Sequence, residues 1–384
     1  MQRNTSKIQE KEKDFFSDLL IWYFVSDVEF HRRFNGLTRR FFIFTYKIKQ
    51  SNNQANDRMV TCNLCPRYCS IKEGAFGFCG IRTCRNGEIV LLAYGKNTGL
   101  AIDPIEKKPL NHFYPGSQVL SFGSIGCNFG CRFCQNWSTA HSRDLSLLKK
   151  SSTPEEIVDL AKHFQCRSVA FTYNEPIIGA EYVLDVARLC RREGIKTVAV
   201  SNGFIAENER RTFFDQIDAV NIDLKSFSDE FYQKYCNSRL EPVLETLCYL
   251  ARQSTTWFEV TTLLIPTLND SDAEIELLSQ WLVRNLGVET PVHFSAFHPA
   301  YQLTDLPPTP PQTLFRAREI AHSAGLCFVY TGNINDPAGQ TTYCPQCRQS
   351  VISRNRYRID EYNIDTESCC RFCGQTISGQ FEEE

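Results

Sequence analysis

Three cysteines stand within eight residues of one glycine-containing stretch, GCNFGCRFCQNW: Cys127, Cys131 and Cys134, with the spacing C-x3-C-x2-C. A closed structural metal site takes four protein ligands, whereas a site that binds an outside molecule keeps one position free. Thiolates bind zinc and iron–sulfur clusters alike. Three of them can hold three irons of a [4Fe–4S] cluster and leave the fourth iron for an exogenous chelate. The alternatives are a zinc site with a remote fourth ligand and a group of buried structural cysteines. The glycines and Asn128 favour a loop over the latter.

Two further groups of cysteines have the spacing of metal ligands. Cys62, Cys65, Cys69 and Cys79 form C-x2-C-x3-C-x9-C, and four ligands predict a closed structural site. Zinc is the first choice there and an iron–sulfur cluster is the alternative, because ligand type alone does not separate them. Cys84 is an alternative to Cys79, but the sequence GFCG predicts a turn at Cys79.

Near the end of the sequence, two C-x2-C pairs predict a zinc ribbon: Cys344 with Cys347, and Cys370 with Cys373. A redox iron of the rubredoxin type is the alternative, and the adjacent Cys369 is expected to be spare. The remaining cysteines occur singly and are predicted to be small buried residues: Cys166, Cys190, Cys236, Cys248 and Cys327.

The elements that must position these groups are clearest in residues 115–330, where apolar runs alternate with stretches of helical length. The expected strands are 119–125, 168–173, 196–200, 219–225, 257–265, 292–297 and 327–330. One expected helix begins with Thr153 as its N-cap and Glu156 closing a capping box, and another ends at Gly287. Strands that alternate with helices predict a parallel sheet with right-handed crossovers.

Polar motifs follow these strands where each is expected to end: TYNEP (172–176), SNG (201–203), DLK (223–225), IPTLND (265–270) and FHP (297–299). The carboxyl ends of parallel strands meet at one rim, so these motifs and the three cysteines are predicted to share a site. The alternative is that the polar groups cap strand ends and form turns.

Composition excludes several classes of protein. The formal net charge is −2 and the sequence pI is about 6.4, which disfavours nucleic acid as a partner. Most of the 18 cysteines fall in ligand-like groups, which is typical of a reducing compartment. The stretch FFSDLLIWYFV, which contains Asp18, is too short to span a bilayer and lacks the flanks of a signal peptide. A cytoplasmic location without a membrane anchor is predicted.

Four regions are expected: an extension outside the core (1–58), a Cys-rich N-terminal module (59–114), a core barrel (115–330) and a zinc-ribbon-like C-terminal module (331–384). The functional chain is predicted to start at Met59, since residues 1–58 carry no motif and no long helical period. The alternative is an N-terminal extension that packs on the barrel as a small helical cap.

Five stretches together resemble one family: CNLCPRYCSIKEGAFGFCGIR, IDPIEKKPLNHFYPGS, GCNFGCRFCQNW, FTYNEP and TYCPQC. Residues 59–384 resemble the radical S-adenosylmethionine superfamily, and within it the radical enzyme of the AmmeMemoRadiSam group, which is similar to pyruvate formate-lyase activating enzymes. The resemblance implies an α/β fold with a partial (β/α)6-type barrel, a [4Fe–4S] cluster and S-adenosylmethionine. It also implies an external electron donor of flavodoxin or ferredoxin type. Reductive cleavage of the cofactor would give a 5′-deoxyadenosyl radical that takes hydrogen from a substrate.

The same resemblance implies roles for individual residues. Phe133 and Gln135 would contact the adenine of the cofactor, and Asn174 and Glu175 its amino group. Asn202, Asp223 and Lys225 would contact its sugar and carboxylate, and His298 would lie near the adenosyl group. Tyr173 and Asn174 replace glycines of the family's amino-group motif. A structural histidine is the alternative reading of His298.

Three functions remain open from the sequence. The first is a radical enzyme that acts on a protein or peptide, in the manner of a glycyl-radical activase, with Memo-like and AMMECR-like protein partners implied by the resemblance. The second is a radical enzyme that modifies a small molecule or RNA. The third is a non-catalytic iron–sulfur or zinc electron-transfer protein, which would be expected to bind its cluster with four cysteines rather than three.

Overall fold

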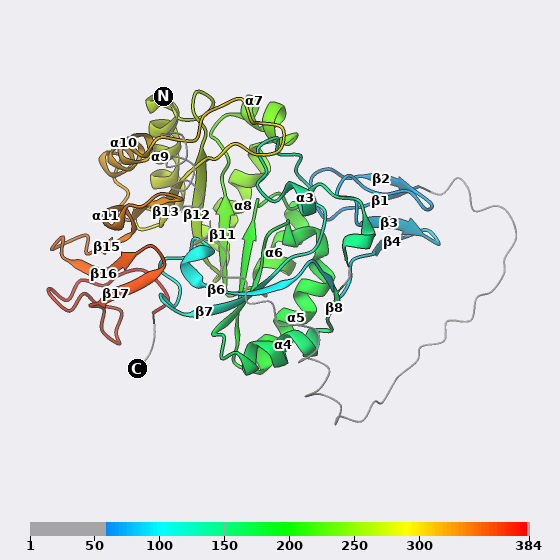
Figure 1. The fold of residues 1–384 in the computed structure, drawn as a ribbon, viewed down its shortest axis with the longest axis horizontal. Helices are drawn as coiled ribbons and strands as arrows, with labels where there is room; N and C mark the ends of the chain where they lie inside the picture. Colours follow the sequence, from blue (N-terminus) through cyan, green and yellow to red (C-terminus); the bar gives the residue numbers. More distant parts are fainter. Residues whose placement is uncertain (1–58, 149, 382–384) are drawn as a thin grey trace, which may run out of the picture. The chain divides into compact units, whose positions relative to one another are not determined.

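The computed structural model describes residues 59–148 and 150–381, so the prediction for residues 1–58 lies outside the described residues. In the described chain the largest sheet has eight strands in the order β14-β13-β12-β11-β10-β9-β7-β6 (Figure 1). Its strands are β6 (Leu100–Pro104), β7 (Gln118–Phe122), β9 (Ser168–Phe171), β10 (Lys196–Ser201), β11 (Ala219–Asp223), β12 (Trp257–Leu264), β13 (Val292–Ala296) and β14 (Val329–Gly332). All neighbouring pairs are parallel except β6 with β7. The predicted parallel α/β sheet is therefore confirmed.

A helix lies between each successive pair of parallel strands. In order they are α4 (Pro154–His163), α5 (Ala180–Arg192), α6 (Glu207–Phe214), α8 (Glu241–Gln253), α9 (Asp272–Leu286) and α10 (Pro311–Ser323). The capping box of Thr153 and Glu156 is present at the start of α4, and α9 ends at Gly287, as predicted. Strand β6 was not anticipated. It comes from the segment that the sequence groups with the N-terminal module, and it pairs antiparallel with β7 at the sheet edge.

Alternate residues of the strands divide between two cores. Leu120, Val169 and Val220 face the main core together with the helices, whereas Val119, Ala170 and Val198 face an inner core on the other side of the sheet. The chain from 105 to 114 supplies that inner core with Ile105, Leu110, Phe113 and Tyr114. Both faces of the sheet are thus buried, which explains the nearly continuous apolar runs of its strands.

A buried carboxylate holds segment 105–114 against the inner-core face of the sheet. Glu259 of β12 has no exposed surface and accepts hydrogen bonds from the backbone amides of Asn111 (2.9 Å) and His112 (2.7 Å). Its other partners are Nε1 of Trp257 (3.2 Å) and Nε2 of His293 (2.6 Å). An unpaired buried carboxylate would be costly, so these four donors explain how Glu259 is tolerated in the interior.

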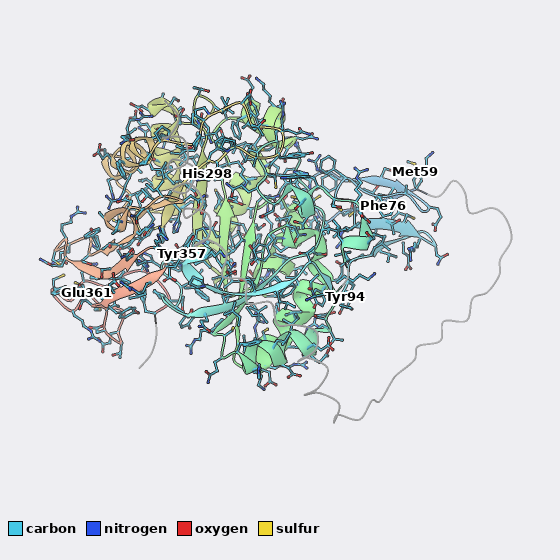
Figure 2. All side chains as sticks on the ribbon, viewed as in Figure 1. Met59, Phe76, Tyr94, His298, Tyr357 and Glu361 are labelled. Carbon is cyan, nitrogen blue, oxygen red and sulfur yellow. The ribbon has the colours of Figure 1, made fainter. Side chains whose placement is uncertain are left out.

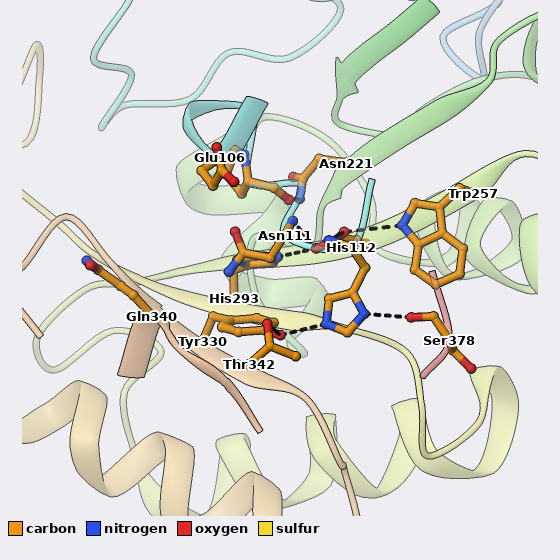
Figure 3. Close-up of polar contacts among 12 residues, drawn as sticks. Glu106, Asn111, His112, Asn221, Trp257, His293, Tyr330, Gln340, Thr342 and Ser378 are labelled. Carbon is orange, nitrogen blue, oxygen red and sulfur yellow. Dashed lines mark hydrogen bonds and ion pairs between the residues drawn. The ribbon is translucent and has the colours of Figure 1, made fainter. Parts of the chain in front are cut away.

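The same network joins the C-terminal module to the large sheet. The His112 ring lies between the carbonyl of Ser378 and the hydroxyl of Tyr330, at 2.6 Å from each (Figure 3). The Tyr330 hydroxyl is also hydrogen-bonded to the Thr342 hydroxyl (2.8 Å). Thr342 Oγ1 accepts a further hydrogen bond from Nη1 of Arg354 (2.8 Å). The module itself contains α11 (Pro337–Gln340) and a three-stranded sheet of β15 (Thr342–Tyr343), β16 (Ser350–Asn355) and β17 (Arg358–Tyr362).

The N-terminal module is built from short hairpins. Strand β1 (Met59–Thr61) pairs with β2 (Ser70–Lys72), and β3 (Arg82–Arg85) pairs with β4 (Glu88–Leu91). A third pair, β5 (Lys96–Asn97) with β8 (Lys150–Ser151), ties this region to the chain that leads into α4. Figure 1 shows β1–β4 and β15–β17 at opposite ends of the large sheet. No helix in residues 59–148 and 150–381 has both the length and the apolar character needed to cross a bilayer.

Candidate active site

The three-cysteine loop, defined as residues 123–134, leaves the carboxyl end of β7. It is held against the chain that follows β11, because the amide of Gly130 donates to the Cys236 carbonyl and the amide of Arg132 to the Tyr235 carbonyl, both at 2.8 Å. Gly126 has φ +83°, and a Cβ there would lie 2.2 Å from the Cys79 carbonyl oxygen. The loop therefore needs glycine at this position, both for its backbone conformation and for its contact with the N-terminal module.

Asn174 is placed beneath this loop by the turn after β9. Its Oδ1 accepts from the Ser124 amide (2.8 Å), and its Nδ2 donates to the carbonyls of Ile125 (3.2 Å) and Gly126 (3.1 Å). Both ends of the amide are used in holding the backbone that precedes Cys127. The structure thus gives Asn174 a positioning role for the loop, and the cofactor contact implied by the resemblance remains a prediction.

Glu175 and Asn202 link the ends of β9 and β10 to the first cysteine. The buried Glu175 carboxylate accepts from the Asn202 amide and from the Ser201 hydroxyl, both at 2.8 Å. The side-chain Nδ2 of Asn202 donates to Asn128 Oδ1 (2.8 Å) and lies 3.8 Å from Cys127 Sγ. Burial raises the pKa of the Glu175 carboxyl to about 7, although the donated hydrogen bonds oppose the shift.

Asp223 and Lys225 form an ion pair where β11 ends. Lys225 Nζ lies 2.8 Å from Asp223 Oδ2, and the two side chains are 16% and 27% exposed. Burial alone would lower the pKa of Lys225, but the neighbouring Asp223 carboxylate and Cys131 thiolate raise it above its usual value. Lys225 therefore stays an ammonium close to the three-cysteine loop, with an orientation that its carboxylate partner fixes.

The remaining residues predicted for the cofactor pocket lie in different surroundings. Phe133 is buried and packs against Phe231, with ring centroids 5.8 Å apart. Gln135, the residue after the three-cysteine loop, is exposed. His298 follows β13 and is also exposed (Figure 2). The structure therefore brings Glu175, Asn202 and the Asp223–Lys225 pair to the cysteines, while Phe133 faces the protein core.

One neighbour of the site was missed by the sequence analysis. Cys236, predicted to be an ordinary buried cysteine, has no exposed surface, and its thiol lies next to that of Cys131. It ends a π-helical turn, η4 (Tyr232–Cys236), and is followed by Asn237 in the left-handed conformation (φ 48°). The Tyr232 hydroxyl also accepts from the Lys225 amide (2.9 Å). No spacing in the sequence signals these contacts, because they depend on the π-helical turn that follows β11.

The C-terminal cysteine set, defined as Cys344, Cys347, Cys370 and Cys373, is closely packed. All four Sγ atoms lie within 4.8 Å of one another. Cys344 and Cys373 have their Sγ atoms 3.6 Å apart, and the Sγ atoms of Cys347 and Cys370 are 3.7 Å apart. Four thiolates about 2.3 Å from one tetrahedral ion would stand about 3.8 Å apart. The set therefore fits a single tetrahedral metal ion.

The N-terminal cysteine set, defined as Cys62, Cys65, Cys69 and Cys79, lines one cavity together with Arg67 and Asn128. Cys84 does not line it. Its thiol has no exposed surface and lies 3.5 Å from Glu73 Oε2 instead. The arrangement agrees with the choice of Cys79 over Cys84 as the fourth member of the set.

Comparisons with known proteins show what this chain is similar to. The family model described as the Radical SAM superfamily matches residues 123–278. The chain is 44% identical over 323 residues to an uncharacterized protein of Methanocaldococcus jannaschii, covering 84% of this chain and 96% of that protein. It is 26% identical over 231 residues to the pyruvate formate-lyase 1-activating enzyme of Escherichia coli, covering 55% and 91%. A solved radical SAM methyltransferase from Sphaerobacter thermophilus aligns with a TM-score of 0.45 at 17% identity, covering 59% and 71%.

Proposed function

The chain belongs to the radical S-adenosylmethionine superfamily, and we propose that it cleaves S-adenosylmethionine reductively at a [4Fe–4S] cluster held by Cys127, Cys131 and Cys134. When bound, the cluster would supply the electron for breaking a carbon–sulfur bond of the cofactor, and the resulting 5′-deoxyadenosyl radical would take a hydrogen atom from the substrate. The observation that carries the proposal is the convergence of three cysteines with Glu175, Asn202 and the Asp223–Lys225 pair at the carboxyl ends of neighbouring strands.

The chain's own residues prepare this site before the cofactor arrives. Asn174 holds the backbone ahead of Cys127, and Asn202 places its amide toward the Cys127 sulfur. Lys225 offers an ammonium for the cofactor's carboxylate, a charge-assisted contact that is stronger than a neutral hydrogen bond. Glu175 offers a buried carboxylate, although its oxygens already accept three hydrogen bonds. Its part is therefore to orient Asn202 at the rim.

A protein or peptide is the substrate class that the similarities favour. The 26% identity to a pyruvate formate-lyase activating enzyme extends over 91% of that relative, which supports a role like that of a glycyl-radical activase. The five motifs of residues 59–384 support assignment to the AmmeMemoRadiSam group, with Memo-like and AMMECR-like proteins as candidate partners. An external flavodoxin or ferredoxin would supply the electron. The non-catalytic alternative is not favoured, since the pyruvate formate-lyase 1-activating enzyme that this chain resembles is named as an enzyme.

The C-terminal cysteine set is proposed to hold structural zinc. Its two C-x2-C turns are alike: the amide of Cys344 donates to the carbonyl of Gln349 (2.9 Å), and the amide of Cys370 donates to that of Gln375 (2.8 Å). In each turn the residue after the second cysteine has positive φ, 63° at Arg348 and 74° at Gly374. Matching turns that present four thiolates at tetrahedral spacing are typical of zinc ribbons.

The test of the proposed cofactor site is spectroscopic. The full chain is reconstituted anaerobically with iron and sulfide and reduced with dithionite, and the electron paramagnetic resonance spectrum is recorded with and without S-adenosylmethionine. Binding of the cofactor to the free iron is expected to change the spectrum of the wild-type cluster. Cys131→Ala should abolish the response, whereas Cys248→Ala, at a cysteine far along α8, should keep it. A spectrum that S-adenosylmethionine leaves unchanged in the wild type would refute the proposed site.

A further inference from the structure

The spacing of sulfur atoms separates the cysteine groups of this chain into two kinds. In the part of the chain that the structure describes, the C-terminal cysteine set is the one group of His, Cys, Asp and Glu side chains whose ligand atoms all lie within 4.8 Å of one another. No three sulfurs of the N-terminal cysteine set meet that distance, although all four line one cavity. The three cysteines of the three-cysteine loop do not meet it either.

This difference has a simple geometric cause. Four thiolates on one tetrahedral ion share that ion and stand about 3.8 Å apart, as the bond length of about 2.3 Å requires. Thiolates on a cluster bind different irons, which sulfide ions hold apart, so the thiolates are farther from one another. The N-terminal set thus resembles the three-cysteine loop, and differs from the C-terminal set, in having no three sulfurs within 4.8 Å of one another.

The surroundings of the N-terminal set suit a cluster. The amide of Phe78 donates to Cys69 Sγ at 3.4 Å, and backbone amides also donate to Cys65 and Cys79. Such N–H···S bonds tune iron–sulfur centres. The guanidinium of Arg67 lies among the same sulfurs and is held by the Asn128 carbonyl (2.5 Å) and by the Phe78 ring, 3.5 Å away. It places a fixed positive charge beside a group of thiolates.

The N-terminal set also lies directly against the three-cysteine loop. The Cys79 carbonyl packs on Gly126, which precedes the first cysteine of that loop. Phe78 approaches Gly130, and Arg67 bonds to the backbone of Asn128 between them. The two cysteine groups are thus connected by direct contacts between the N-terminal module and the three-cysteine loop. The positive charge of Arg67 lies close to Cys127 as well as to Cys65.

We propose that the N-terminal cysteine set binds a second iron–sulfur cluster, with more than one iron, next to the cluster of the three-cysteine loop. This replaces the sequence-based first choice of a structural zinc. The proposal goes beyond cofactor cleavage, because it concerns a separate ligand set and stands whether or not the three-cysteine loop binds S-adenosylmethionine.

The experiment measures metal and sulfide in the full chain after anaerobic reconstitution with iron, sulfide and zinc. The variants are Cys69→Ala in the N-terminal set, Cys131→Ala in the three-cysteine loop and Cys84→Ser as a matched control. Cys84 is buried in the same module, close in sequence to Cys79, but outside the cavity. Iron, zinc and sulfide per chain are determined, and Mössbauer spectra identify the iron species.

The wild type should contain two clusters and one zinc per chain. Cys69→Ala should lose two or more irons with matching sulfide and keep its zinc, whereas Cys84→Ser should lose neither. A wild type with two zinc ions and one cluster, in which Cys69→Ala loses zinc alone, would overturn the proposal. Absence of the proposed cluster in the three-cysteine loop would look different, since Cys131→Ala would then keep all the wild-type iron. If Cys69→Ala does not fold, Cys65→Ser, which keeps a side chain of similar size, provides the same comparison.

Discussion

His112 should make the described chain sensitive to mild acid. Its ring has no exposed surface and bonds at both nitrogens. The Ser378 carbonyl can only accept, so Nδ1 carries the proton and Nε2 accepts from the Tyr330 hydroxyl. A second proton at Nε2 would break the bond to Tyr330. Burial lowers the pKa of His112 to about 4, although the nearby Glu259 carboxylate raises it and the charges of Arg354 and His293 lower it further.

The size of the effect follows from linkage. The pKa of His112 is about 4 in the fold, against an ordinary value of about 6.5 in the unfolded chain. The imidazole is neutral in both states above pH 6.5, and below that value the unfolded chain gains a proton that the fold does not. Stability is therefore lost as pH falls from about 6.5 toward about 4. Between pH 7.5 and 5.0 the loss from this one group is about 2 kcal/mol.

The assay is urea unfolding of the reconstituted full chain at pH 7.5 and 5.0, for the wild type and for His112→Asn. Asparagine keeps a donor for Ser378 but cannot titrate, and losing the bond to Tyr330 should cost about 1–3 kcal/mol at pH 7.5. The variant should lose about 2 kcal/mol less than the wild type when the pH is lowered. Acid effects on the thiolate ligands occur in both proteins and cancel in this difference. Equal losses in the two proteins would refute the assignment of His112 as the buried acid-sensitive group.

Three further changes have defined outcomes. Lys225→Ala should weaken binding of S-adenosylmethionine, measured by calorimetry, roughly 10- to 100-fold, because a charge-assisted contact contributes about 1.5–3 kcal/mol. Lys162→Ala, at an exposed ion pair, is the control and should not weaken binding. An unchanged affinity of Lys225→Ala would show that Lys225 is not part of the pocket. Gly126→Ala should lower both iron content and melting temperature, because its Cβ would lie 2.2 Å from the Cys79 carbonyl oxygen. Gly179→Ala, where a Cβ would meet open space, is the control and should lower neither. Wild-type iron content and melting temperature in Gly126→Ala would show that the loop does not need glycine at this contact. Cys347→Ala should lose one zinc and melt at a lower temperature. Cys369→Ser, next in sequence to the ligand Cys370, is the control, and retention of zinc by Cys347→Ala would contradict the assigned ligand set.

The sequence predicts best the features that local chemistry decides. The capping box at Thr153 and Glu156 and the end of α9 at Gly287 involve residues close in the chain, and both are present. The parallel sheet follows from alternating strands and helices, and the rim that brings Asn202 and Lys225 to the cysteines follows from that sheet. These inferences need no knowledge of packing.

The features that the sequence does not predict depend on distant contacts. Glu259 bonds to amides nearly 150 residues earlier in the chain, and His112 bonds to Ser378, 266 residues later. Cys236 reaches Cys131 through a π-helical turn that has no sequence signature. The spacing of cysteines along the chain likewise gives no distance between sulfurs. For this reason the sequence does not decide between zinc and an iron–sulfur cluster at the N-terminal cysteine set.

The central claim is that Cys127, Cys131 and Cys134 hold the cluster at which S-adenosylmethionine is cleaved. The most direct measurement is the amount of 5′-deoxyadenosine formed per chain when the reconstituted protein is incubated anaerobically with S-adenosylmethionine and dithionite. The wild type and Cys369→Ser should both form it, and replacing any one of the three cysteines by alanine should abolish it while the C-terminal zinc remains bound. Formation of 5′-deoxyadenosine at the wild-type level by Cys131→Ala, or no formation by a wild type with its clusters intact, would contradict the account.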